Sequence, residues 1–251
     1  MSDTQTESGR GAFGRNSVPW NRARTRITGP PAEPAPAPPR PGVGHGDESV
    51  TEYPQRRSGA PARASVIGVG RQPRIFEPGA YYHLFSRGND GEAIVRDDVD
   101  CLDFFRWFSR IVAREKWRVI TYCLMTNHYH LLLRPADTGF AAGMQLLNCG
   151  HARRMNQKYE RWGHLFRNHY GWRPVEGDEH LREACRYIVL NPVRAGLCKT
   201  PDEWPWSSYR AAVDLDVPSD FFALGELLAL FGTRPPQARE AYRDFVATGL
   251  P

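Results

Sequence analysis

Two histidines separated by one bulky aromatic residue, His128 and His130, have the type and spacing that could bind a divalent metal. The stretch around them is rich in β-branched and aromatic residues, which is typical of a buried strand. Alternate residues of a strand share a face, so His128 and His130 point to one side and Tyr129 to the other. Neighbouring imidazoles on a rigid element are a suitable start for a metal site. Such a pair is more often simply packed or solvated, so the spacing alone leaves the metal site open.

A second candidate pair, Tyr187 and Asn191, lies at the end of a predicted helix over residues 178–190. Residues four apart share a helical face, so the phenol and the amide are presented together. Pro192 cannot continue the helix and restrains Asn191 before it, which predicts that the helix ends here. Taken alone, a helical tyrosine is more often a packing residue, and an asparagine before proline is commonly a helix terminator.

Together, the two pairs supply what a phosphodiester transesterase needs. A metal polarises a non-bridging phosphate oxygen, and a tyrosine hydroxyl attacks phosphorus to form a covalent ester. A free phenol has a pKa of about 10, so it must be activated at neutral pH. Two imidazoles and an amide oxygen leave positions open on Mg²⁺ or Mn²⁺ for phosphate and water, but imidazoles also suit zinc, so ligand type does not decide which metal binds. A metal hydrolase with a water nucleophile is the alternative that does not need Tyr187.

The elements that must position these residues form an α+β pattern. We predict a ferredoxin-like split βαβ arrangement, in which an antiparallel sheet packs against helices. The predicted strands cover residues 79–86, 118–125 and 128–134, with a fourth inside 163–175. The predicted helices cover residues 97–116, 139–160 and 178–190.

Composition divides the chain of 251 residues into three parts. Residues 1–73 are rich in proline, alanine and arginine and have few large apolar residues, which predicts a disordered tail. Residues 74–210 are the predicted catalytic domain. Residues 211–251 are predicted to be a helical appendage, with helices over 221–231 and 237–246 interrupted by Pro235 and Pro236.

Bulk properties restrict the class of protein. The net charge of +5 and the pI of about 9.1 suit nucleic acid or another polyanion. The five cysteines are odd in number and form no C-x-x-C pair, so we expect free thiols in a reduced, cytoplasmic compartment. No apolar run is long enough to span a bilayer, and we expect no membrane partner.

Three blocks of the sequence carry a family resemblance: residues 122–133 (YCLMTNHYHLLL), 163–167 (GHLFR) and 186–197 (RYIVLNPVRAGL). They resemble the signature blocks of the IS200-like tyrosine transposases, single-tyrosine enzymes of the histidine–hydrophobic–histidine (HUH) nuclease superfamily. The similarity is closest to the branch associated with repetitive extragenic palindromes (REP), which has a tryptophan-containing motif like residues 204–209 (WPWSSY). The resemblance covers about residues 76–210.

The resemblance implies roles for four residues. His128 and His130 match the metal-binding pair, Tyr187 matches the nucleophile, and Asn191 matches a further polar metal ligand. It implies cleavage of single-stranded DNA through a 5′-phosphotyrosine, with Mg²⁺ or Mn²⁺ and no organic cofactor, by a homodimer or a monomer. The chain departs from the family pattern at Thr126, where many relatives have proline, and in its long N-terminal extension.

A mixture of aromatic and basic residues predicts where single-stranded or hairpin DNA binds, because aromatic faces stack on bases and guanidinium groups hold phosphates. The predicted DNA-binding residues are Arg153, Arg154, Lys158, Arg167, His169, Trp172, Arg173 and Arg194. The bland alternative is that the aromatic residues belong to the core and the charges to a solvated helix face. A non-catalytic protein that binds DNA hairpins on the same scaffold is the alternative function.

Overall fold

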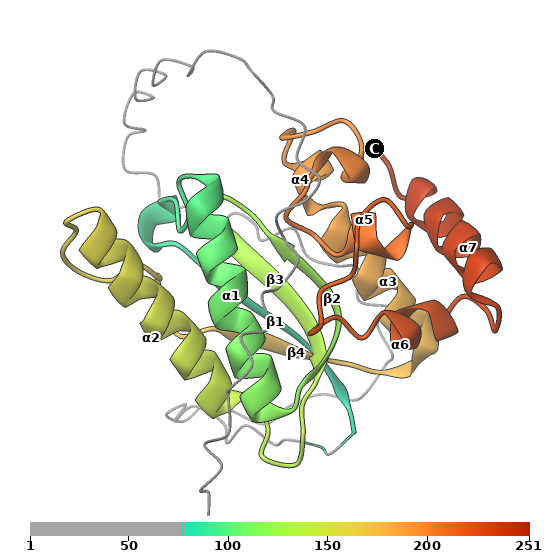
Figure 1. Cartoon of the computed structure of the whole chain (residues 1–251), viewed down its shortest axis with the longest axis horizontal. Coiled ribbons are helices and arrows are strands. Elements are labelled where there is room, and N and C mark those ends of the chain that lie inside the picture. The colour runs from blue at the N-terminus through green and yellow to red at the C-terminus, as the bar shows by residue number, and fades with distance from the viewer. Residues whose placement is uncertain (1–76, 78) are drawn as a thin grey trace, which may run out of the picture. The chain divides into compact units, whose positions relative to one another are not determined.

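The computed structural model describes residue 77 and residues 79–251 (Figure 1). The predicted tail over residues 1–73 lies outside the described residues, so both its disorder and the domain boundary at residue 74 stay predictions. Across the described part of the chain, no helix is both long enough and apolar enough to cross a membrane.

The centre of the fold is a four-stranded antiparallel sheet with the strand order β2-β3-β1-β4. The strands are β1 (Tyr81–Arg87), β2 (Arg118–Leu124), β3 (His128–Arg134) and β4 (Gly171–Val175). β1 pairs with β3 on one side and with β4 on the other. Helices connect β1 to β2 and β3 to β4, so the predicted ferredoxin-like α+β class is confirmed.

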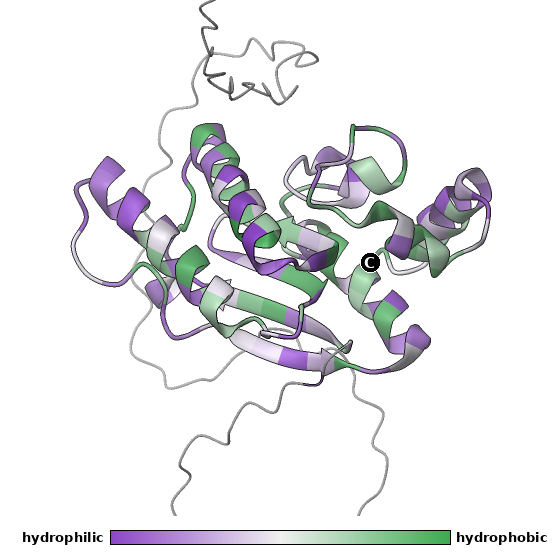
Figure 2. Cartoon of the chain, turned by 60° about the horizontal axis from the view of Figure 1, so that its bottom comes forward, coloured by the Kyte–Doolittle hydropathy of each residue, from purple (hydrophilic) through white to green (hydrophobic). Residues whose placement is uncertain are grey.

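Two long helices, α1 (Asp98–Glu115) and α2 (Ala141–Lys158), lie side by side over one face of the sheet (Figure 1). The Asp97 side chain caps α1 by accepting a hydrogen bond of 2.8 Å from the Asp100 amide. α2 approaches α1 closely at Gly150, where a Cβ atom would lie 2.4 Å from Nε1 of Trp107. In Figure 2 green hydrophobic segments lie within the sheet, while these helices alternate between hydrophobic and hydrophilic along their length.

The opposite face of the sheet is covered by α3 (Gly177–Val189), which is followed by the single turn α4 (Asn191–Arg194). Strand alternation therefore divides β3 between two environments. The Tyr129 ring lies 5.2 Å from Phe104 of α1, whereas the His130 ring lies 5.8 Å from Tyr187 of α3 (centroid distances). One side of β3 builds the core under α1 and the other builds the candidate site.

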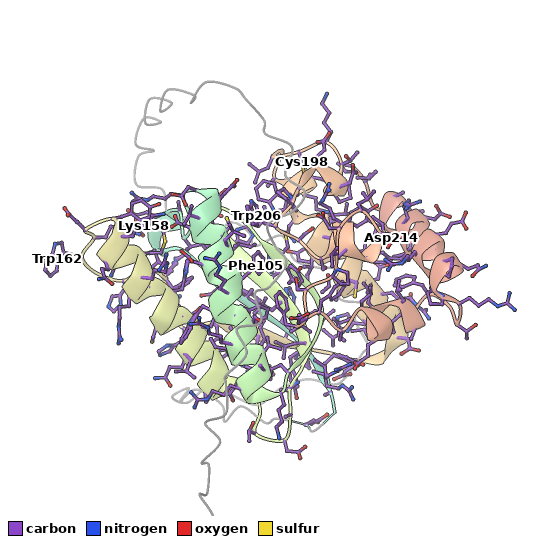
Figure 3. All side chains as sticks on the ribbon, in the orientation of Figure 1. Phe105, Lys158, Trp162, Cys198, Trp206 and Asp214 are labelled. Atoms are coloured by element: carbon purple, nitrogen blue, oxygen red, sulfur yellow. The ribbon has the colours of Figure 1, made fainter. Side chains whose placement is uncertain are left out.

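The chain after α4 runs along β2 and pairs with it. The Leu124 amide donates to the Trp206 carbonyl at 2.9 Å, and the Ser208 amide donates to the Tyr122 carbonyl at 3.0 Å. Figure 3 shows Trp206 beside Phe105, and the two rings are stacked with centroids 6.3 Å apart. These contacts cover what would otherwise be an open sheet edge.

The remaining elements are short. They are the 3-10 helices η1 (Asn89–Gly91) and η2 (Pro201–Glu203) and the helices α5 (Tyr209–Ala212), α6 (Leu224–Ala229) and α7 (Pro235–Ala247). Both predicted C-terminal helices are present, but Pro235 and Pro236 begin α7, where the first turn needs no amide donors. The Ala223 amide donates to the Val119 carbonyl of β2 at 2.8 Å, which attaches this segment to the sheet.

Candidate active site

The histidine pair lies at the start of β3. Both rings point toward α3, with centroids 5.0 Å apart. The Met125 amide donates to the His128 carbonyl at 2.8 Å and closes the turn that enters the strand. His130 is buried and His128 is partly buried, so a rigid sheet holds both imidazoles side by side.

Both imidazoles are in the neutral form that metals bind. Burial, together with the positive charge of Arg87, lowers the pKa of His128 to about 4. Burial, with the neighbouring rings of His83 and His128, holds the pKa of His130 well below its usual range. Hydrogen bonding by the Asn191 side chain acts in the opposite direction on both pKa values.

The tautomer of His128 is set by its neighbour. Nδ1 of His128 lies 2.7 Å from Oδ1 of Asn127, and an amide oxygen can only accept, so Nδ1 carries the proton. This arrangement leaves Nε2 without a proton, so its lone pair can bind a metal. A histidine that binds a metal usually donates a hydrogen bond from its other ring nitrogen. That bond fixes the orientation of the ring and its tautomer.

Tyr187 comes from α3 and meets the histidines from across the site. Its ring centroid lies 5.8 Å from His130 and 6.0 Å from His83. Burial raises the pKa of Tyr187, while Arg194, Arg173 and a hydrogen bond with Asn191 lower it in part. The guanidinium of Arg194 lies 5.3 Å from the centre of the tyrosine ring, where its positive charge favours a developing phenolate.

Asn191 stands at the junction of α3 and α4. Its Nδ2 donates to the Tyr187 carbonyl at 2.9 Å, one of the carbonyls that a helix end leaves without an intrahelical partner. This bond orients the amide, and the Asn191 side chain also interacts with both imidazoles and with the phenol. The four residues selected from the sequence are therefore close together, although His130 and Tyr187 are 57 positions apart along the chain.

The donor set offers two ring nitrogens and one amide oxygen, a combination that several divalent ions accept. Within residues 77 and 79–251, no group of three or more His, Cys, Asp or Glu side chains could hold a metal. A site at this position would therefore use the two neutral imidazoles and the amide oxygen of Asn191. Such a set leaves coordination positions open for phosphate and water, as Mg²⁺ and Mn²⁺ require.

One site residue, His83 of β1, is absent from the sequence prediction. Its Nε2 lies 2.9 Å from Nδ1 of His130. Burial, with the charges of Arg173 and His180, lowers the pKa of His83 to about 3. The signal available in the sequence is a histidine in a predicted strand, but only the pairing of β1 with β3 brings it to His130.

Two of the predicted DNA-binding residues belong to the site itself. Arg173 of β4 is the register partner of His83, so the two side chains share the face under α3. Arg194 lies over Tyr187. Both place positive charge near the phenol of Tyr187.

Three further predicted DNA-binding residues lie in the α1–α2 layer, on the other face of the sheet. Arg154 forms an ion pair with Asp103 of α1, and Lys158 forms ion pairs with Asp97 and Asp100 at 2.8 and 2.7 Å. Figure 3 shows Lys158 at the end of α2 next to α1. Arg153 is exposed on the same helix. Their role in DNA binding stays a prediction.

The last three predicted DNA-binding residues lie in or near the loop that leads to β4. Trp172 packs against Tyr82 and Phe140 at centroid distances of 5.8 Å each, so much of its ring belongs to the core. Arg167 and His169 are exposed. The Arg167 amide donates to the Arg87 carbonyl at 3.0 Å, and Arg87 is the register partner of His128. Arg167 therefore stands at the end of the sheet that carries the histidine pair.

Comparison with known proteins agrees with this architecture. Residues 78–191 match the family described as "Transposase IS200 like". A curated protein of Haemophilus influenzae named "Putative REP-associated tyrosine transposase" is 24% identical over 118 residues, which cover 42% of this chain and 66% of that relative. The solved structure of a REP-associated tyrosine transposase bound to a REP hairpin matches with a TM-score of 0.51 and 13% identity. It covers 61% of this chain and 93% of the other, and at that identity it supports the fold alone.

The chain shares its fold with a solved REP-associated tyrosine transposase, and its candidate site brings the histidine pair together with Tyr187. Residues 78–191 are similar to the IS200-like transposase family, and the resemblance to the REP-associated branch is confirmed.

Proposed function

We propose that this protein is a metal-dependent endonuclease and transposase that cleaves and rejoins single-stranded DNA at hairpin or palindromic sites. The observation that carries the proposal is the meeting of Tyr187 from α3 with the His128–His130 pair of β3 and with Asn191. A nucleophile, two neutral imidazoles and an amide oxygen converge on one face of the sheet. This convergence supports transesterification more directly than any of the residues does alone.

In the proposed reaction the Oη atom of Tyr187 attacks phosphorus and forms a new P–O bond. The bond from phosphorus to the 3′ oxygen breaks, and the proton lost by the phenol is balanced by the proton that the 3′-hydroxyl gains. The 5′ phosphate stays on the enzyme as a tyrosine ester. Attack by a 3′-hydroxyl on that ester reverses the step and joins a strand.

His128, His130 and Asn191 would hold the divalent ion, which supplies polarisation of a non-bridging phosphate oxygen. The residues of the chain provide the rest. The imidazoles are held neutral by burial, and the Asn191 amide is oriented by its bond to the Tyr187 carbonyl. Arg173 and Arg194 favour the phenolate form of Tyr187 and offer charge to the phosphate.

Hairpin DNA is the proposed substrate because a protein of similar fold was solved with a REP hairpin. The exposed Arg167 lies beside the strand end that carries His128, so a strand leaving the site would meet it. Phosphate contacts of this kind position DNA without reading its sequence.

The polarity of the cleaved ends tests the proposed reaction. A hairpin oligonucleotide labelled at either end is incubated with the protein and Mg²⁺ or Mn²⁺, and the products are separated on denaturing gels. We expect the 5′-side fragment to end in a 3′-hydroxyl that a polymerase can extend, and the 3′-side fragment to stay with the protein. Fragments with a free 5′ phosphate and no attached protein would contradict the tyrosine reaction and indicate a water nucleophile.

A comparison of two arginines tests where the DNA lies. Arg173→Ala is expected to weaken hairpin binding roughly tenfold, because it removes a charged hydrogen-bond donor beside Tyr187. The same change should reduce the slope of affinity against salt by about one. Arg154→Ala is expected to change affinity by less than about twofold, since its charge is already paired with Asp103. Fluorescence anisotropy across a salt series measures both, and an equal loss for Arg154→Ala would place the DNA along α2 instead.

A further inference from the structure

His83 contacts the candidate metal site without belonging to its proposed ligand set. It lies on β1, and its Nε2 is 2.9 Å from Nδ1 of His130. The two ring centroids are 5.0 Å apart. The His83 ring is held by its neighbours, with Phe85 at 5.4 Å and Tyr187 at 6.0 Å between centroids. We infer that His83 is a positioning residue that accepts a hydrogen bond from Nδ1–H of His130 and so leaves Nε2 of His130 free to bind the metal.

The inference follows from the number of protons on two neutral rings. A neutral imidazole has one N–H, so one ring of this pair donates and the other accepts. If His83 donated, the proton of His130 would sit on Nε2, and that nitrogen could not bind a metal. If His130 donates from Nδ1, its Nε2 keeps a lone pair. Metal binding through His130 is therefore compatible with only the second arrangement.

His128 shows the same arrangement with a different acceptor. Its Nδ1 lies 2.7 Å from Oδ1 of Asn127, which can only accept, so its Nε2 carries no proton. His83 would do for His130 what Asn127 does for His128. The two pairs are geometrically alike, since Nδ1 of the ligand histidine lies 2.9 Å from its acceptor in His130 and 2.7 Å in His128.

Metal affinity of two His83 variants tests the inference, which rests on the metal site proposed above. Mn²⁺ is titrated into the DNA-free protein, and free Mn²⁺ is measured by electron paramagnetic resonance. His83→Leu removes the acceptor and is expected to weaken Mn²⁺ binding about 10- to 100-fold, the usual cost of losing the partner of a ligand. His83→Gln keeps an amide oxygen that can accept from Nδ1–H of His130, so its affinity should stay within about threefold of wild type.

The matched control is His151→Leu. His151 is also a buried, hydrogen-bonded histidine, with Nε2 at 2.7 Å from the Ile94 carbonyl, but it lies on α2 across the sheet from the site. Its loss should lower thermal stability and leave Mn²⁺ affinity unchanged. Equal Mn²⁺ affinity in wild type and His83→Leu would overturn the inference and leave the metal site intact. Wild-type protein that binds no Mn²⁺ would overturn the proposed metal site together with the inference.

Nitrogen-15 NMR of the wild-type protein tests the tautomer directly and does not depend on a variant that folds. In protein saturated with Mg²⁺, the inference predicts a proton on Nδ1 of His130 and on Nδ1 of His83. A proton on Nε2 of His130, or Mg²⁺-dependent shifts that identify Nε2 of His83 as a ligand, would overturn it.

Discussion

Tyr187→Phe is expected to reduce DNA cleavage by about 10³-fold or more, since it removes the atom that attacks phosphorus. Hairpin affinity should change little. The phenyl ring keeps its packing against His83 and His130, at 6.0 and 5.8 Å between centroids, and Arg194 still lies over it. Cleavage on denaturing gels and binding by fluorescence anisotropy, measured on the same hairpin, separate the two effects.

The control for this change is Tyr122→Phe. Tyr122 is also buried, but it faces the α1 layer, where its ring lies 5.2 Å from Phe105. Its hydroxyl lies 3.4 Å from Oγ of Ser219, so the change removes a buried hydrogen bond far from the histidines. Cleavage should survive Tyr122→Phe. Cleavage that also survives Tyr187→Phe would show that the nucleophile is not this tyrosine.

His130→Ala is expected to reduce metal-dependent cleavage by about 10²-fold or more, because a bound ion supplies several kcal/mol of charge stabilisation in the transition state. His130 is 2% exposed, so the change also leaves a cavity under α3. His128 is partly buried, so His128→Ala should also reduce cleavage but should lower the melting temperature less than His130→Ala does. Cleavage rates over a Mn²⁺ series, together with thermal melts, measure both consequences.

Chelation provides the matching test without a mutation. Excess EDTA should stop cleavage by the wild-type protein, and added Mn²⁺ or Mg²⁺ should restore it. The buried His151, which contacts the Ile94 carbonyl rather than the site, can be replaced by glutamine as a control for the loss of a histidine. Full activity in EDTA, or in both site-histidine variants, would contradict the proposed role of the metal.

Local patterns were enough to predict the two halves of the site. The period-two alternation of β3 separates His130 from Tyr129, and the i, i+4 spacing joins Tyr187 to Asn191. These patterns depend only on the geometry of one strand and one helix. The strand and helix order likewise predicts the sheet of four strands, because each element has its own apolar period.

Properties that depend on tertiary pairing could not be predicted in this way. The role of His83 depends on the register between β1 and β3, where Phe85 faces His130 and His83 faces Leu132. Arg154 and Lys158 are predicted to bind DNA, but they pair with acidic residues in α1 and at its N-cap, about 50 to 60 positions away in the sequence. The sequence of α2 itself has no pattern that predicts which acidic residues pair with Arg154 and Lys158.

The short strand β4 shows how local context limits such predictions. Trp172 and Arg173 are neighbours in the sequence, and both are predicted to bind DNA. The pleat sends Trp172 toward Tyr82 and Phe140, and it leaves Arg173 on the face of His83. β4 has five residues and contains Pro174. Its alternation of apolar and polar residues is therefore too short to predict which side chains face the core.

Mass spectrometry of the covalent adduct is the most direct test of the proposed reaction. The protein is incubated with a single-stranded hairpin and Mn²⁺, the adduct is purified under denaturing conditions, and nuclease and protease digestion leave a nucleotide on one peptide. We predict a phosphotyrosine ester at Tyr187, absent without metal and absent in Tyr187→Phe. Cleaved DNA with no adduct on any peptide, or an adduct on a residue other than Tyr187, would contradict the proposed function.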